Sequence, residues 1–233
     1  MPKSRSAAAA EPLTRSVEDY LKAIYRLSLQ GGTASTTALA THLGIAAASV
    51  TGMIKRLAGQ GYVRHEPYRG VSLTAHGRRA ALRTLRNHRV LEAYLVAFLG
   101  YDWDNVHVEA ERLEHAVSSE LIERMALALG NPSVDPHGDP IPGPDGTVAE
   151  VEYTPLPDFP IGTTAEVRQV DSTDAERLRY LAAIGLKPGA MVVVTARQPF
   201  DGPITVRTPG GVQVVGHDVG ALVFCLPATG AAR

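Results

Sequence analysis

Residues 36–74 read TTALATHLGIAAASVTGMIKRLAGQGYVRHEPYRGVSLT, and this stretch decides the fold of the first third of the chain. Residues 36–43 form a short helical segment that Gly44 can end, and a second helical segment follows over 46–58. Two short β-prone runs then flank a turn at 66–70. A short helix, a tight turn, a second helix and a β-hairpin predict a winged helix-turn-helix domain.

An amphipathic segment precedes this stretch and extends the predicted DNA-binding domain to residues 16–74. Apolar residues recur there at helical spacing from Val17 to Leu27. Residues 1–90 carry 14 Lys and Arg against 4 Asp and Glu, whereas 91–233 carry 9 against 20. Only the basic first third is therefore suited to a polyanion, and we expect it to bind double-stranded DNA. Residues 1–15 are expected to be a disordered arm.

The second helix of such a pair lies in the major groove. Its first turn offers small side chains and hydroxyls, which permit close approach to phosphates and thymine methyl groups. We expect DNA contacts from Thr36, Thr37, Ala47, Ser49, Thr51, Lys55, Arg56 and Arg69. That turn contains no Asn, Gln or Arg, so base readout should be sparse and DNA shape should contribute. The alternative, a helix-turn-helix used for protein contacts, is disfavoured by the basic charge.

Residues 75–130 predict a helical domain, beginning with a long Arg-rich helix from His76 to about Leu99. Its arginines, Arg86 among them, are expected to face solvent or DNA. The apolar residues of this region, including Trp103, exceed what one short helical hairpin can bury, which predicts a dimer interface.

The last two segments differ sharply in composition. Residues 131–160 contain 8 of the 16 prolines of the chain and are predicted to be a stiff linker. Residues 161–227 read as five short strands with one helical insert, which predicts a small, partly open barrel. The expected fold class is therefore mainly α, with a small C-terminal β domain.

His and Glu residues at helical spacing indicate a metal site. In the segment VHVEAERLEH (106–115), spacings of three and four residues place four potential ligands along one helix face: His107, Glu111, Glu114 and His115. His88 and Glu92 form a second pair four residues apart, Asp19 is a third contribution, and Asp171 and Asp174 are further candidates. Together these residues predict a binuclear cation site; the alternatives are a solvated acidic helix face and, for a single histidine, a solvated or satisfied core residue.

Cys225 is the only cysteine, so the chain has no internal disulfide and a reducing compartment is expected. No apolar run approaches the ~20 residues that span a bilayer. The N-terminal residues lack the hydrophobic core of a signal peptide. We therefore expect a cytoplasmic protein without a membrane partner.

These features, in this order, resemble the diphtheria toxin repressor family of iron- and manganese-dependent transcriptional regulators. The similarity covers about residues 16–227, and its most specific motifs are EDYLKAIY (18–25), NHRVLE (87–92), VHVEAERLEH (106–115) and DPHGDPIPG (135–143). The segment 161–227 is similar to the SH3-like (FeoA-like) domain of many members. The resemblance implies a DNA-binding domain, a helical metal-binding and dimerisation domain over 75–130, and this SH3-like domain.

The resemblance also implies two metal sites per subunit. One matches Asp19, Glu111, Glu114 and His115, and the other matches His88, Glu92 and His107. Iron-type members place sulfur ligands at the positions of Asp19 and Glu111, where this chain has carboxylates as manganese-type members do. Hard oxygen donors favour Mn(II), with Fe(II) second. Lys22 departs from the manganese-type pattern, which usually has a Glu there.

The expected function is a homodimeric, metal-dependent repressor that senses Mn(II), binds a palindromic operator and controls metal-uptake genes. It is expected to have no enzymatic activity and no small-molecule substrate. An Fe(II)-dependent repressor of the same family is the first alternative. A di-metal hydrolase using the His/Glu cluster is the second, although it leaves the basic winged helix unexplained. A winged-helix regulator with a purely structural metal is the third.

Overall fold

The computed structural model describes residues 13–66, 69–149 and 151–228, so most of the predicted N-terminal arm lies outside the described residues. The chain forms two compact units, Met1–Thr84 and Leu85–Arg233. Helix α4 (Ala75–Leu99) begins in the first unit and continues into the second.

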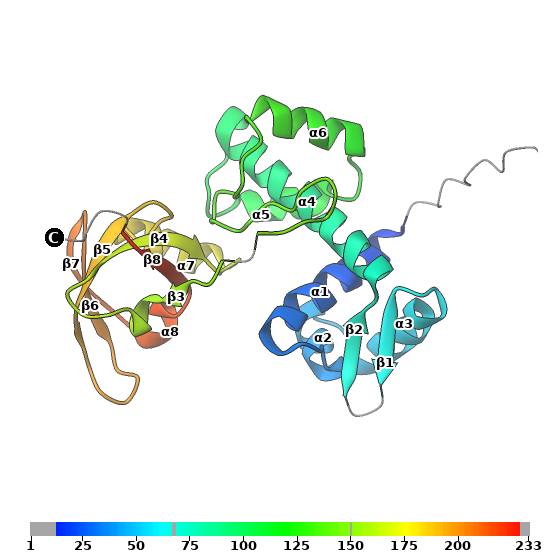
Figure 1. The fold of residues 1–233 in the computed structure, drawn as a ribbon, viewed down its shortest axis with the longest axis horizontal. Coiled ribbons are helices and arrows are strands. Elements are labelled where there is room, and N and C mark those ends of the chain that lie inside the picture. Colours follow the sequence, from blue (N-terminus) through cyan, green and yellow to red (C-terminus); the bar gives the residue numbers. More distant parts are fainter. Residues whose placement is uncertain (1–12, 67–68, 150, 229–233) are drawn as a thin grey trace, which may run out of the picture. The chain divides into compact units, whose positions relative to one another are not determined.

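Before α4, the first unit contains three helices and a hairpin (Figure 1). Its elements are α1 (Arg15–Gly31), α2 (Thr36–Leu43), α3 (Ala47–Gly59), β1 (Val63–Glu66) and β2 (Gly70–Leu73). The Ser35 side chain accepts the N–H of Ala38 and caps α2, and Gly44, at φ 66°, ends this helix in the left-handed conformation. β1 pairs with β2 in antiparallel register. The predicted winged helix-turn-helix arrangement is confirmed.

The second unit begins with a helical region formed by α4 (Ala75–Leu99), α5 (Val106–Leu113) and α6 (Ser119–Ala128). Five buried apolar residues form its core: Val90, Leu91, Ala110, Ile122 and Ala126. Arg86 corrects the sequence prediction, because it is buried, binds both carboxylate oxygens of Glu123 and donates to the carbonyl of Pro142. Only a tertiary contact explains its burial, since its neighbours in the sequence do not distinguish it from the other arginines of α4.

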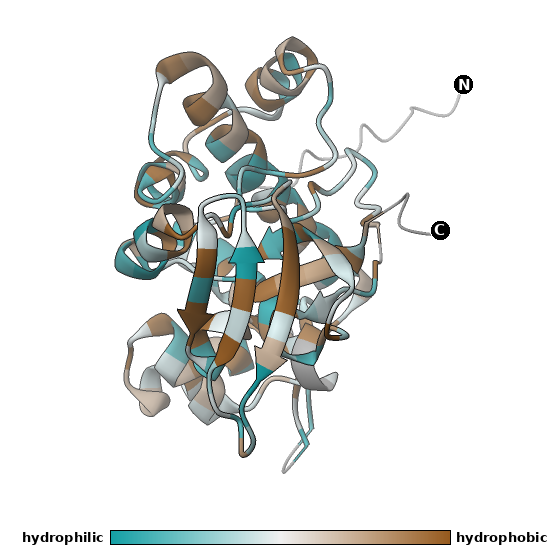
Figure 2. Cartoon of the chain, turned by 90° about the vertical axis from the view of Figure 1, so that its left-hand side faces the viewer, coloured by the Kyte–Doolittle hydropathy of each residue, from teal (hydrophilic) through white to brown (hydrophobic). Residues whose placement is uncertain are grey.

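The rest of the second unit is a six-stranded antiparallel sheet in the order β3-β8-β4-β5-β6-β7. The elements are β3 (Thr154–Pro155), η1 (Leu156–Asp158), β4 (Thr164–Val170), α7 (Ala175–Ala183), β5 (Met191–Arg197), β6 (Ile204–Thr208), β7 (Gly211–Val215), α8 (His217–Gly220) and β8 (Val223–Pro227). The strands carry both apolar and polar residues (Figure 2), because one face is buried and the other is open. The predicted fold class is confirmed, with β3 as an additional strand.

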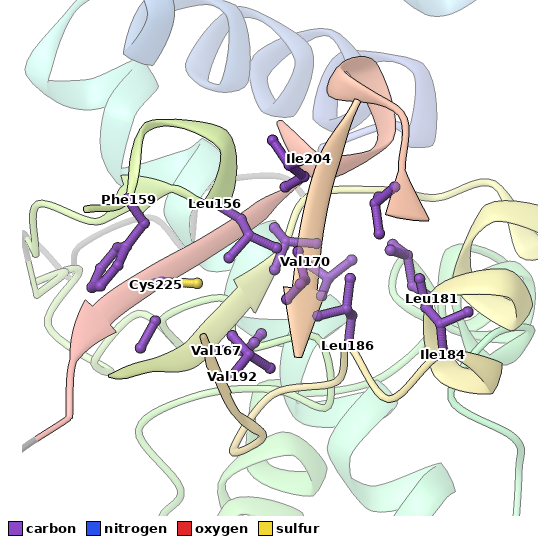
Figure 3. Packing of buried hydrophobic residues seen from close by; sticks show 14 of the residues in the cluster. Leu156, Phe159, Val167, Val170, Leu181, Ile184, Leu186, Val192, Ile204 and Cys225 are labelled. Carbon is purple, nitrogen blue, oxygen red and sulfur yellow. The ribbon is translucent and has the colours of Figure 1, made fainter. Parts of the chain in front are cut away.

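The sheet and α7 enclose an apolar core (Figure 3), in which Leu181 of α7 and its C-cap Ile184 face the apolar residues of the strands. Trp103, which precedes α5, belongs to this core. The sequence assigned Trp103 to a dimer interface, but its indole is buried at 9% exposure inside the same chain. The Lys187 ammonium lies 4.9 Å from the centre of its ring.

The proline-rich segment 131–160 does more than link two domains. Asp135 and His137 are buried within it, and so are Leu156 and Phe159 near its end. Val170 of β4 donates its N–H to the carbonyl of His137, and a Cβ added to Gly138 would lie 1.8 Å from the carbonyl oxygen of Arg168. The segment is thus packed directly against β4.

Among the described residues, no single helix has the length and apolar character required to cross a membrane. The bent pair formed by α2 and α3, at 112° to each other, meets the criterion by length and composition alone.

Candidate metal centre

Helix α4 and the segment that contains α5 bring the predicted ligands of the second unit together. His88 and Glu92 stand one turn apart on the buried side of α4, with side chains 1% and 3% exposed. His107 lies in the first turn of α5. The helix ends at Leu113, so Glu114 is its C-cap and His115 lies in the following turn rather than on the continuous helix predicted from spacing.

Three of these side chains form a nearly equilateral triangle of donor atoms. His88 Nε2 lies 2.9 Å from Glu92 Oε1 and 2.9 Å from His107 Nδ1, and the last two atoms are 3.0 Å apart. For bonds of about 2.1 Å, adjacent donors in an octahedron lie about 3.0 Å apart. The triangle therefore has the dimensions of one face of an octahedral divalent cation site.

Glu114 contacts the ring nitrogen of His88 that is not part of the triangle. Its Oε2 lies 2.5 Å from His88 Nδ1, and a carboxylate oxygen can only accept, so Nδ1 carries the proton. When His88 is neutral, its lone pair is therefore on Nε2, directed at Glu92 and His107. A carboxylate that fixes the tautomer of a ligating histidine in this way is common around protein-bound metals.

A second group adjoins the first. Glu111, Glu114 and His115 each offer a ligand atom, and these atoms lie within 4.8 Å of one another. The carboxylate Oε1 of Glu114 lies 3.2 Å from His115 Nε2, while its other oxygen contacts His88. The buried carboxylate of Glu114 thus contacts a histidine of each group. Asp19 lies on α1 of the first unit, with its Oδ2 3.9 Å from Arg15 Nε.

The electrostatics of the cluster favour an ionised Glu92. Burial raises the pKa of Glu92, but the charge of His88 and hydrogen bonds with His107, His137 and His88 lower it more, so the net pKa lies well below its usual range. Glu92 is therefore a carboxylate at neutral pH, the form that binds cations.

A third group was not among the ligands predicted from the sequence. Glu92, Asp135 and His137 are all buried and offer ligand atoms within 4.8 Å of one another. Burial, assisted by the charges of Asp139 and Glu92, raises the pKa of Asp135 to about 8. The motif DPHGDPIPG contains both new residues, but its prolines suggested a turn in a linker.

Asp171 and Asp174 were the remaining ligand candidates from the sequence. Asp174 is the exposed N-cap of α7, where its Oδ1 accepts the N–H groups of Glu176 and Arg177. These hydrogen bonds with the backbone hold its pKa below the usual value. Within the described part of the chain, neither Asp171 nor Asp174 belongs to any of the three groups.

Most of the residues predicted to contact DNA are exposed in the first unit; at the start of α2, Thr37 is exposed and Thr36 is half-buried. Val50, Ile54 and Leu57 bury one face of α3. Five residues of α3 that the sequence selected are exposed: Ala47, Ser49, Thr51, Lys55 and Arg56. Arg69 is exposed beside the hairpin turn, 3.7 Å from Glu66. α3 thus presents hydroxyls and cations together, which suits contact with phosphates.

Comparison with known proteins shows the family to which the chain belongs. Models described as "Iron dependent repressor, N-terminal DNA binding domain", "Iron dependent repressor, metal binding and dimerisation domain" and "FeoA domain" match residues 12–71, 74–143 and 154–225. The iron-dependent repressor IdeR of Mycobacterium leprae (strain TN) is 31% identical over 210 residues, which cover 85% of this chain and 90% of that protein. The chain belongs to the iron-dependent repressor family.

Two further proteins are similar to most of this chain. The diphtheria toxin repressor of Corynebacterium efficiens (strain DSM 44549 / YS-314 / AJ 12310 / JCM 11189 / NBRC 100395) is 29% identical over 202 residues, covering 80% of this chain and 85% of that protein. A solved structure of a manganese-dependent transcriptional repressor in complex with manganese is 40% identical, with a TM-score of 0.83, and the match covers 91% of this chain and 99% of that one.

The family assignment confirms the predicted class of function. This chain is a metal-dependent transcriptional repressor with a DNA-binding part and a metal-binding and dimerisation part. All ligand candidates on α4, α5 and the turn after α5 fall within the matched metal-binding domain.

Proposed function

We propose that this repressor senses Mn(II) in the cytoplasm and, as a metal-loaded homodimer, represses genes for metal uptake. The observation that carries the proposal is the donor set. Within the described residues, every candidate ligand is an imidazole or a carboxylate, and Cys225 is buried in the apolar core of the sheet. Such donors suit Mn(II), whereas sulfur donors favour softer ions. The manganese-bound relative supports the same choice.

The ligands are assigned to two positions. His88, Glu92 and His107 form the first, for which the triangle of donors supplies the fit. Glu111, Glu114 and His115 form the second, which we propose Asp19 completes from the DNA-binding unit. When bound, the ion supplies positive charge that offsets the mutual repulsion of these carboxylates.

The ligands link metal binding to DNA binding through Asp19. Because Asp19 lies on α1 of the DNA-binding unit, ligation by it would restrict the range of positions open to that unit. In a dimer, the two α3 helices must be about 34–36 Å apart to enter successive major grooves of a palindromic operator. A fixed separation favours that arrangement, and operator DNA should then tighten metal binding by the same factor.

Iron is the competing ion. IdeR of Mycobacterium leprae is named for iron, and Lys22, where manganese-type relatives usually have a Glu, is buried on α1 at 6% exposure. A protonated lysine has no lone pair to donate to a cation. This difference removes one oxygen donor from the manganese-type pattern and is the specific observation that favours Fe(II).

Fluorescence anisotropy with labelled promoter DNA tests the proposal. Apo protein is titrated with Mn(II), and with Fe(II) under anaerobic conditions, at constant salt because phosphate contacts are salt-dependent. We expect Mn(II) at micromolar concentration to raise DNA affinity at least about tenfold, equivalent to about 1.4 kcal/mol. A larger response to Fe(II) would assign the protein to the iron-sensing branch.

Two histidine variants control for nonspecific effects. His115→Ala should abolish the response to metal while leaving the folded dimer intact. His217→Ala, which removes a half-exposed imidazole of α8 outside all three groups, should respond as the wild type does. Tight DNA binding that ignores both ions would refute metal sensing, and unfolding on metal removal would indicate a structural metal instead.

A further inference from the structure

Lys22 places an ammonium group in a buried position on α1. Only 6% of the residue is exposed, and lysine is almost never buried to this extent unless its charge is paired. Burying a cation costs free energy, and a negative charge nearby offsets that cost. The role of Lys22 therefore depends on the carboxylates that lie beside it.

Helical spacing places Lys22 beside Asp19. The two residues stand three positions apart within α1, so they are neighbours on its surface, with Cβ atoms about 5–6 Å apart. Glu18 stands four positions before Lys22, and its carboxylate already lies 3.5 Å from Nη2 of Arg83 on α4. An α1 that brings Asp19 to the metal centre therefore brings the ammonium of Lys22 with it.

A single divalent ion does not neutralise the proposed Asp19 position. Asp19, Glu111 and Glu114 supply three negative charges, and a histidine that ligates is neutral. One Mn(II) leaves one negative charge at the position, and the ammonium of Lys22 balances it. Because the side chain of Glu114 is fully buried, water does little to screen an unbalanced charge there.

We propose that Lys22 is a fixed countercharge for the Asp19 position, which limits this position to one divalent cation and weakens its affinity for that cation. The inference rests on the proposed function, because it assumes that Asp19, Glu111, Glu114 and His115 bind an ion. An ammonium and a divalent ion about 6 Å apart repel each other enough to lower affinity about tenfold, even at the permittivity of water.

The countercharge also affects the metal-free protein. Without an ion, the ammonium of Lys22 reduces the repulsion among the three carboxylates and so stabilises the empty position. A weaker affinity for the ion and a smaller repulsion without it act in the same direction. Lys22 thus raises the metal concentration at which Asp19 ligates and the DNA-binding unit responds.

The test measures Mn(II) affinity and the number of ions per subunit for variants of Lys22, by calorimetric titration and native mass spectrometry. Lys22→Met keeps the length of the side chain and removes its charge, so we expect about tenfold tighter binding at one position. Lys22→Arg keeps the charge and should bind Mn(II) as the wild type does. Arg207→Met, the same loss of charge at an exposed position of β6, should leave the affinity unchanged.

Two further variants locate the effect of the charge. Lys22→Glu adds a fourth carboxylate, which one divalent ion cannot neutralise, so this variant should bind one more Mn(II) per subunit than the wild type. In a His115→Ala background the Asp19 position lacks a ligand, and Lys22→Met should then have no effect on Mn(II) affinity. An effect that persists in this background would mean that Lys22 acts elsewhere and would overturn the inference.

The outcomes separate this inference from the proposed function. If the wild type and Lys22→Met bind Mn(II) equally and both keep metal-dependent DNA binding, the countercharge is refuted while the sensor stands. If no variant binds Mn(II), both are refuted. If Lys22→Met and Lys22→Arg change affinity alike, packing rather than charge matters and the inference fails. Circular dichroism checks the fold of each apo variant, and if Lys22→Glu does not fold, Lys22→Met still decides.

Discussion

The C-terminal sheet and the helical region around α4 belong to one compact unit, yet their interiors are built from different residues. The sheet core contains 17 buried side chains, none of them charged. Of the ten buried polar residues among those described, seven lie between Arg86 and His137, and only Thr208 lies in the sheet. Packing alone can hold the first interior together. The second requires that its charges be paired or bound to cations, since unpaired buried charge is costly.

The largest effect should come from truncating the sheet core. Phe159 is 2% exposed, and Phe159→Ala should lower the free energy of unfolding by about 3–5 kcal/mol, because it removes buried apolar surface and leaves a cavity. Urea denaturation monitored by circular dichroism measures the loss, which should be similar in the presence and absence of metal. Phe200→Ala, at a position 99% exposed, should change it by less than about 0.5 kcal/mol. If adding metal restored the free energy of unfolding of Phe159→Ala, the stability of the sheet core would depend on metal, which would contradict this contrast.

Metal removal should affect the helical region next most strongly. A ligand at 100 times its dissociation constant stabilises the native state by about 2.7 kcal/mol per site. Chelation should therefore lower the denaturation midpoint and increase hydrogen exchange in α4 and in the turn that carries Glu114 and His115. Glu114→Gln should show a much smaller difference between apo and metal-loaded protein. Equal stability with and without metal would mean that protons or internal ion pairs already balance the buried charges.

The same contrast explains what the sequence could reveal. The spacing of apolar residues and the turn-forming residues predicted the helix-turn-helix, the hairpin and five of the strands, because these signals are local. His88, Glu92, His107, Glu114 and His115 were predicted to be ligands from spacing and resemblance, and their ligand atoms gather in adjoining groups although α5 ends before Glu114. The burial of Arg86, Trp103, Asp135 and His137 escaped prediction, since it depends on contacts with partners that are 34 to 56 residues away or in another layer. Charged and proline-rich segments offer no periodic signal for such packing.

A smaller effect is expected at the start of α7, where a predicted ligand is a helix cap. Asp174→Ala should cost about 1 kcal/mol, because Glu176 and Arg177 lose the acceptor for their N–H groups. Metal affinity and stoichiometry should not change, and calorimetric titration with Mn(II) measures both. Asp171→Ala, three residues earlier, serves as the matched control. A lost or weakened ion in Asp174→Ala would return this residue to the metal centre.

The labelling rate of Cys225 reports on the sheet core of the wild-type protein, so no substitution that alters stability is needed. Its thiol is fully buried in the sheet core, and burial raises its pKa to about 12. At pH 8 almost none is thiolate, so thiol reagents should react slowly with the native protein and rapidly in urea. If the sheet core is independent of metal, chelation should leave the native labelling rate unchanged while exchange in α4 rises. A parallel rise in labelling would show that loss of ions loosens both interiors, which the hydrogen bond from Val170 of β4 to the carbonyl of His137 permits.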